Sequence, residues 1–174
     1  MAERTSAGRA PAARWERLPL AGLIDLQGAA AAVAAFAQVL QTDLPAIPNQ
    51  VRRGAGVDVF WLAPSHWLVR VPLSREARTA AALAAAADAH PAAVTVVSDA
   101  CAGFRLSGTG ASEVLAQGCP LDLHTLTAGT CARSLLARAQ VLIVPLHDGP
   151  GYELFVESSH ARYAELWLGT ALDG

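Results

Sequence analysis

Cys119, Asp122 and His124 are the residues whose types best match a metal site. Thiolate, carboxylate and imidazole are the groups that zinc takes as ligands, and Cys119 and His124 lie five residues apart. That spacing matches no zinc-finger pattern, and the other two cysteines, Cys101 and Cys131, are scattered. We therefore expect no metal site, but a buried thiol and a solvent-facing or capping imidazole.

Residues 107–112, Ser-Gly-Thr-Gly-Ala-Ser, link a predicted strand to a short helix. A glycine turn at a helix N-terminus can hold a phosphate. However, Glu113 stands where a dinucleotide fingerprint has its third glycine, and no Walker lysine exists because all 13 basic residues are arginine. The sequence favours a tight turn with Thr109 as the helix N-cap, and no cofactor site.

The histidines have no evident catalytic partners in the sequence. His66 lies in a predicted hairpin turn between Ser65 and Trp67, and His147 lies beside Asp148 in another turn. A catalytic histidine needs a nucleophile or an acid within reach, and the sequence contains no Gly-x-Ser-x-Gly motif. We expect no catalytic residue on this chain.

The elements that carry these residues are helices interspersed with strands and hairpins. Residues 57–71 alternate apolar and polar side chains about an Ala-Pro-Ser-His turn, which indicates a hairpin. Helical spacing predicts helices near 28–41 and 74–89, a short one after Thr109 that ends at Gly118, and a last one capped by Ser158. Further strands are predicted near 94–98, 102–107, 131–137, 140–146 and 152–156. This order predicts an α+β fold with mainly antiparallel sheet.

Residues 1–14 are predicted to form a disordered leader, and residues 15–174 to form one domain. The predicted loop over residues 42–56 carries Arg52 and Arg53 side by side. The pI of about 6.2 and the net charge of −2 argue against nucleic acid as a partner. No apolar run is long enough to span a membrane, no signal peptide is evident, and the odd cysteine count fits a reducing cytoplasm. Charged residues make up only 16%, which suggests a surface covered by another chain.

Several segments from residue 57 onward resemble the gamma subunit of heterotetrameric sarcosine oxidase. The most specific is Val-Leu-Ala-Gln-Gly-Cys-Pro-Leu-Asp-Leu-His at residues 114–124. The hairpin at 60–68 and the segments 96–99, 106–108, 129–132 and 152–156 follow in the family's order.

The resemblance implies a non-catalytic subunit of an alpha-beta-gamma-delta complex. Such a complex demethylates sarcosine oxidatively and passes the one-carbon unit to tetrahydrofolate. It implies that the flavins, the nicotinamide cofactor NAD and the folate site belong to the alpha and beta subunits. We expect contacts with alpha, beta and delta, chiefly alpha, and Trp15, Arg52 and Arg53 are the candidate interface residues.

The family in turn resembles the folate-binding domain of glycine-cleavage T-proteins, which implies that fold here. T-proteins carry an acidic pair before a Leu-Ile-Val strand, whereas Gln140 and Val141 precede residues 142–144 here. Neither residue can act as a carboxylate base. Two alternatives stay open: a stand-alone folate-binding or aminomethyltransferase-like module, and the gamma subunit of a related amine oxidase with another substrate.

Overall fold

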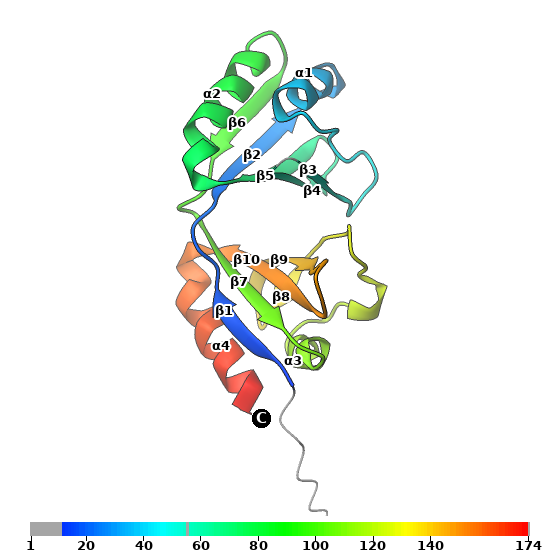
Figure 1. The fold of residues 1–174 in the computed structure, drawn as a ribbon, viewed down its shortest axis with the longest axis vertical. Helices are drawn as coiled ribbons and strands as arrows, with labels where there is room; N and C mark the ends of the chain where they lie inside the picture. The colour runs from blue at the N-terminus through cyan, green and yellow to red at the C-terminus, as the bar shows by residue number, and fades with distance from the viewer. Residues whose placement is uncertain (1–11, 55, 174) are drawn as a thin grey trace, which may run out of the picture.

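Two lobes stacked one on the other make up the molecule (Figure 1). The computed structural model describes residues 12–54 and 56–173. Each lobe contains one five-stranded sheet, and every pair of neighbouring strands is antiparallel. The helices lie on the outer faces of the sheets, so the prediction of an antiparallel α+β fold is confirmed.

The first lobe has the strand order β3-β4-β5-β2-β6 and carries helices α1 and α2. Its elements are β2 (Gly22–Gly28), α1 (Ala30–Leu40), β3 (Val51–Gly54), β4 (Val57–Ala63), β5 (His66–Val71), η1 (Leu73–Arg75), α2 (Glu76–Ala87) and β6 (Ala92–Val96).

The second lobe has the strand order β1-β7-β10-β9-β8 and carries helices α3 and α4. Its elements are β1 (Arg14–Arg17), β7 (Cys101–Ser107), α3 (Ala111–Ala116), η2 (Leu123–Thr125), β8 (Ala132–Leu136), β9 (Ala139–Pro145), β10 (Gly151–Glu157), η3 (Ser158–His160) and α4 (Ala161–Asp173).

The two lobes repeat one topology. The first runs β2-α1-β3-β4-β5-α2-β6, and the second runs β7-α3-β8-β9-β10-α4 with β1 in the place that β6 takes in the first. The chain therefore passes from lobe to lobe twice, between β1 and β2 and between β6 and β7. The architecture is that of an internal duplication whose second copy borrows its edge strand from the start of the described chain.

Strand alternation explains how each sheet buries two faces. In the hairpin of β4 and β5, one set of apolar side chains faces α1 and α2, and Leu83 is the fully buried residue of α2 in that core. The opposite face packs against the second sheet. Eight buried residues form this middle layer: Leu23, Val51, Phe60, Leu68, Cys131, Leu142, Val144 and Phe155. The resulting order is helices, sheet, sheet, helices.

Three strands lie where the sequence predicted none, and one of them, β2, is an inner strand of the first sheet. Val51–Gly54 forms β3 within the predicted loop 42–56, paired with β4. Arg14, assigned to the leader, begins β1 and pairs with Ser107; residues 1–11 lie outside the described residues. β1 and β3 are four-residue edge strands, so tertiary pairing rather than local pattern fixes them.

The predicted N-caps Thr109 and Ser158 were wrong. The N-cap of α3 is Gly110 with no side-chain hydrogen bond, and Gln117 is its C-cap. Gly118 follows Gln117 at the end of α3, and it lies against Trp167, whose ring carbon would be 2.5 Å from an added Cβ. The Ser158 hydroxyl donates to the backbone oxygen of Asp99, at the start of a 3-10 turn that precedes α4.

Candidate functional site between the two sheets

The predicted zinc candidates do not converge. Cys119 is buried, and its sulfur lies 3.5 Å from the Ser134 hydroxyl. His124 is exposed, and its backbone nitrogen donates to Asp122 Oδ1 at 3.1 Å. Among residues 12–54 and 56–173, no group of three His, Cys, Asp or Glu side chains could hold a metal ion.

The glycine turn at Gly108 serves the close approach of two chain segments. Its φ is +120°, and an added Cβ would lie 2.1 Å from the backbone oxygen of Ala12. A side chain is therefore excluded by the incoming β1 segment. The turn explains why glycine is required here without invoking a phosphate.

His66 forms a polar contact that the sequence did not reveal. Its Nε2 lies 2.6 Å from Asp25 Oδ2, and Gln27 donates to the other oxygen of Asp25 at 3.1 Å. Asp25 and Gln27 come from β2, which pairs with β5 beside it. His147 is exposed in the turn before β10.

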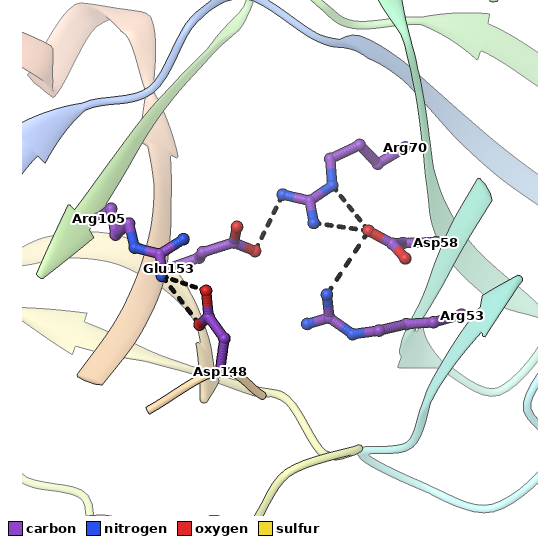
Figure 2. A network of polar contacts seen from close by, with 6 residues as sticks. All are labelled: Arg53, Asp58, Arg70, Arg105, Asp148 and Glu153. Carbon is purple, nitrogen blue, oxygen red and sulfur yellow. Dashed lines mark hydrogen bonds and ion pairs between the residues drawn. The ribbon is translucent and has the colours of Figure 1, made fainter. Parts of the chain in front are cut away.

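The strongest polar constellation is centred on Arg70, in the layer between the sheets (Figure 2). Its Nε and Nη2 donate to Asp58 Oδ2 at 2.9 and 2.5 Å, and its Nη1 donates to Glu153 Oε2 at 2.9 Å. Arg53 Nη1 lies 3.8 Å from the same oxygen of Asp58. Arg53, Asp58 and Arg70 come from the first lobe and Glu153 from the second, so this Arg70 cluster joins the two.

Two aromatic rings flank the same guanidinium. The carbon Cζ of Arg70 lies 5.5 Å from the ring centroid of Phe60 and 5.5 Å from that of Phe155. The two rings lie 5.8 Å apart, one from each lobe. This geometry adds cation–π attraction to the ion pairs.

A second ion pair stands beside the Arg70 cluster. Arg105, which lies opposite Glu153 in the β7–β10 ladder, donates from Nη2 to both carboxylate oxygens of Asp148 at 2.8 and 2.7 Å. The hydrogen bond from Arg105 lowers the pKa of Asp148, and the same bond raises the pKa of Arg105. Figure 2 shows both groups of charges in one view.

A backbone junction joins the lobes at another point. The nitrogen of Val51 donates to Gly129 O at 2.8 Å, and the nitrogen of Cys131 donates to Asn49 O at 2.7 Å. These bonds flank an antiparallel bridge between residues 50 and 130. Cys131 is fully buried beside it, and this burial raises its thiol pKa to about 11.

The Arg70 cluster joins the two sheets, and its charged groups form ion pairs with one another. Across the described ranges, no buried side-chain nitrogen or oxygen lacks a hydrogen-bond partner. Arg70 is therefore neutralised by carboxylates rather than poised to receive an anion. The sequence did not point to Arg70, although the opposite charges at Asp58 and Arg70 are cross-strand partners in the predicted hairpin.

The predicted interface residues lie at different depths. Trp15 in β1 is half-buried, and its ring packs edge-on against Phe104 at 5.9 Å. Arg52 and Arg53 lie on β3, at one edge of the first sheet, where Arg53 joins the Arg70 cluster. Their role in partner contacts stays a prediction.

Gln140 and Val141, which the sequence comparison set against the T-protein acidic pair, lie in β9. Gln140 is exposed, and Val141 is buried in the core beneath α4. A buried valine in that core leaves the position without a group that could transfer a proton.

A family model described as "Sarcosine oxidase, gamma subunit family" matches residues 25–173. The sarcosine oxidase gamma subunit of Corynebacterium sp. (strain P-1) is 31% identical over 142 residues, which cover 80% of this chain and 68% of the relative. That of an Arthrobacter species is 34% identical over 113 residues, which cover 63% of this chain and 55% of the relative.

Two solved structures share the fold. A chain of the heterotetrameric sarcosine oxidase from Corynebacterium sp. U-96 superposes with a TM-score of 0.86 at 22% identity, covering 95% of this chain and 86% of that one. The glycine-cleavage aminomethyltransferase T of Bartonella henselae superposes with a TM-score of 0.70 at 19% identity, covering 91% of this chain and 45% of that one.

No helix within residues 12–54 and 56–173 has the length and apolar character needed to cross a membrane. On the family match and the curated relatives, the chain belongs to the sarcosine oxidase gamma subunit family.

Proposed function

We propose that this chain is a non-catalytic structural subunit of a heterotetrameric sarcosine oxidase, bound to alpha, beta and delta subunits and chiefly to alpha. Its complex demethylates sarcosine oxidatively to glycine and passes the one-carbon unit to tetrahydrofolate. The flavins, NAD and the folate site belong to the partner subunits. The complex works in the reducing cytoplasm, a placement supported by the three free cysteines.

The observation that carries the proposal is the Arg70 cluster. In a fold shared with an aminomethyltransferase, the layer between the sheets is closed by Arg70, Asp58 and Glu153, which satisfy one another. A proton-transferring group needs a free position facing its substrate. Here the central charged side chains pair with one another and join the two lobes. This is what we expect of a structural subunit.

The first test is chemical. We expect the purified chain to be colourless and to leave sarcosine unoxidised, because its sequence has no flavin-binding fingerprint. Absorbance spectroscopy and an oxygen-consumption assay measure these properties. A stoichiometric flavin spectrum in the isolated chain would overturn the assignment of flavin to the partners.

The second test concerns folate, the ligand of the alternative function. Family membership does not favour a stand-alone aminomethyltransferase, and Gln140 and Val141 replace the acidic pair. We expect tetrahydrofolate to bind weakly or not at all in a calorimetric titration. Micromolar affinity would restore the alternative.

A further inference from the structure

Strands β1, β8, β3 and β6 form the edges of the two described sheets, and β6 differs from the other three. The others each carry at least one arginine: Arg14 and Arg17 in β1, Arg133 in β8, and Arg52 and Arg53 in β3. β6 reads Ala-Ala-Val-Thr-Val, with no charged residue, and its Val96 is 44% exposed. Charged side chains on an edge strand keep other chains from pairing with it. β6 lacks that protection.

The repeated topology gives β6 a counterpart in the second lobe. β1 takes the place beside β7 that β6 takes beside β2, and α4 takes the place of α2. Arg17 of β1 reaches α4, where its Nη1 donates to Glu165 Oε1 at 3.0 Å. No residue of β6 can form such an ion pair with α2, because none has a charged side chain. The two equivalent edges therefore differ in charge rather than in position.

The hydrogen-bond register shows which backbone groups β6 leaves free. The nitrogen of Val97 donates to Leu23 O at 2.8 Å, and the nitrogen of Ala29 donates to Pro91 O at 3.2 Å. In an antiparallel pair, residues that bond to the partner strand alternate with residues whose N–H and C=O groups point away from it. Positions 93 and 95 therefore bond to β2, and the N–H and C=O groups of positions 92, 94 and 96 point outward. Within the described residues, no other strand pairs with that side of β6.

This row of free groups determines what can bind there. N–H donors and C=O acceptors alternate along the edge, and the backbone of another extended chain presents matching groups along the whole row. The exposed side chains on the strand, Ala93, Thr95 and Val96, are small or β-branched and suit a sheet. The edge therefore fits an added β-strand rather than a small molecule.

The charges beyond the ends of β6 argue against a second copy of this chain as that strand. Exposed acids stand at both ends, Asp88 before the strand and Asp99 after it. Antiparallel pairing of two copies through β6 would bring Asp88 of each copy toward Asp99 of the other. Like charges placed together oppose association. A strand from a different chain need not bring acids to these positions.

The arginines at the start of α2 point away from the β6 edge. Arg75 Nη1 would lie 3.3 Å from a Cβ added to Gly56, next to β4, and β5 and β2 separate β4 from β6. Glu76 accepts a hydrogen bond from the Ser98 hydroxyl, so it faces the sheet. Arg78 lies two positions further along the helix and is exposed on the opposite side. The acids at the ends of β6 therefore complement basic residues on the added chain.

We propose that β6 is an assembly edge, where an extended segment of another subunit of the oxidase complex adds a strand to the first sheet. That segment pairs with the outward groups of Ala92, Val94 and Val96 and carries basic residues beyond the paired stretch. The proposal rests on the proposed function, because it requires a partner subunit. It specifies the mode of contact, which is backbone pairing.

The first test compares two substitutions at Val96 in binding to a complex of the alpha, beta and delta subunits. Because the N–H of Val96 points outward, Val96→Pro removes a donor to the added strand without removing a hydrogen bond to β2. It should raise the Kd at least about tenfold, since an acceptor on the partner is left unpaired. The matched control Val96→Thr keeps the N–H and a β-branched side chain, and should change the Kd by less than about threefold. Circular dichroism must show that both variants keep the wild-type fold.

Hydrogen–deuterium exchange of the wild-type chain gives a second readout that needs no variant and serves even if Val96→Pro does not fold. The N–H groups of Val94 and Val96 should exchange at least about tenfold more slowly in the complex than in the isolated chain, because they become hydrogen-bonded. The N–H of Thr95 already bonds to β2, so its exchange should change less. Mass spectrometry with electron-transfer fragmentation resolves the three positions. This alternation distinguishes an added strand from a surface that merely covers the edge.

Slower exchange at Val94 and Val96 together with weaker binding of Val96→Pro supports the inference. Wild-type binding with fast exchange at both positions, or with an unchanged Kd for a folded Val96→Pro variant, overturns it and leaves the proposed function intact. Equal weakening by Val96→Thr assigns the contact to the side chain and overturns strand addition. A concentration-dependent dimer of the isolated chain that Val96→Pro abolishes assigns the edge to a second copy and overturns it. Failure of the wild type to bind any subunit overturns the proposed function itself.

Discussion

Arg70 lies where the charged side chains of two sheets meet with little access to water. Its side chain is 17% exposed, and its partners Asp58 and Glu153 are 18% and 11% exposed. Removing Arg70 leaves Asp58 and Glu153 without their nearest counter-ion, which costs more than the intact pairs contribute. We expect the cluster to favour this docking of the two lobes over others.

Replacing Arg70 with alanine should lower the free energy of unfolding by about 3 kcal/mol, because two poorly hydrated carboxylates lose their counter-ion. Urea denaturation followed by circular dichroism measures the change. Arg105→Ala is the matched control: its partner Asp148 is largely exposed, and the expected cost is below about 1 kcal/mol. Equal costs for the two variants would contradict a special role for Arg70.

Cys131 gives the stability a defined pH dependence. Its pKa is raised from 9.0 to about 11 in the fold, because burial disfavours the thiolate. The unfolded chain then loses its proton at lower pH than the folded chain, so the stabilising contribution is fully present below pH 9 and is lost as pH rises through about 11. Denaturation across this window should show a fall in stability that Cys131→Ser reduces; an identical fall in the variant would contradict this origin.

The sequence shows the faces of β5 but not what covers them. Trp67, Val69 and Val71 alternate and form one core, as predicted. Arg70 points to the opposite face, where an arginine would also fit a hairpin with that face in water. Only the packing of the second sheet buries it. Glu153 lies 83 positions away, and neither strand's local pattern specifies that contact.

At the scale of elements, α3 and α4 meet at a glycine. Gly118 was predicted as a helix C-cap, but its reason for being glycine is the ring of Trp167, which the sequence places far along the chain. By contrast, the inward residues of α3, Ala111, Val114 and Leu115, are buried as helical spacing predicts. Periodicity within an element was readable, and contacts between elements were not.

Gly118→Val should destabilise the second lobe by about 2 kcal/mol, since the ring of Trp167 must move to accommodate a branched side chain. Gly169→Ala is the matched control within α4, because an added Cβ there meets nothing within 4 Å. That change should stabilise by about 0.5–1 kcal/mol through helix propensity. Thermal unfolding of both variants measures these changes. A Gly118→Val variant as stable as the wild type would contradict the prediction.

At the scale of the molecule, the duplication explains why the fold class was predictable and the topology was not. In the described part of the chain, ten strands alternate with helices in an order that favours antiparallel α+β. The short strands β1 and β3 gain their strand character from partners in the sheet, so local sequence did not mark them. The repeat of the two lobes is evident in their matching strand order and registers, which are properties of the folded chain.

The edge strand β3 provides a separate test of assembly. Arg52→Ala with Arg53→Ala should weaken binding to the partner subunits, as expected of arginine anchors, while changing the isolated chain's stability by less than about 1 kcal/mol. The Arg53 side chain is 28% exposed and lies 3.8 Å from Asp58, so we expect it to contribute little to the free energy of unfolding. Unfolding of the double variant would make the pair structural, and unchanged affinity would place the interface elsewhere.

The most direct measurement of the central claim is native mass spectrometry of this chain co-expressed with tagged alpha, beta and delta subunits. The account predicts one assembly that contains each subunit once, with all bound flavin and NAD retained when this chain is stripped away under mild denaturant. Recovery of the alpha, beta and delta subunits without this chain, or loss of a cofactor into the stripped chain, would contradict it.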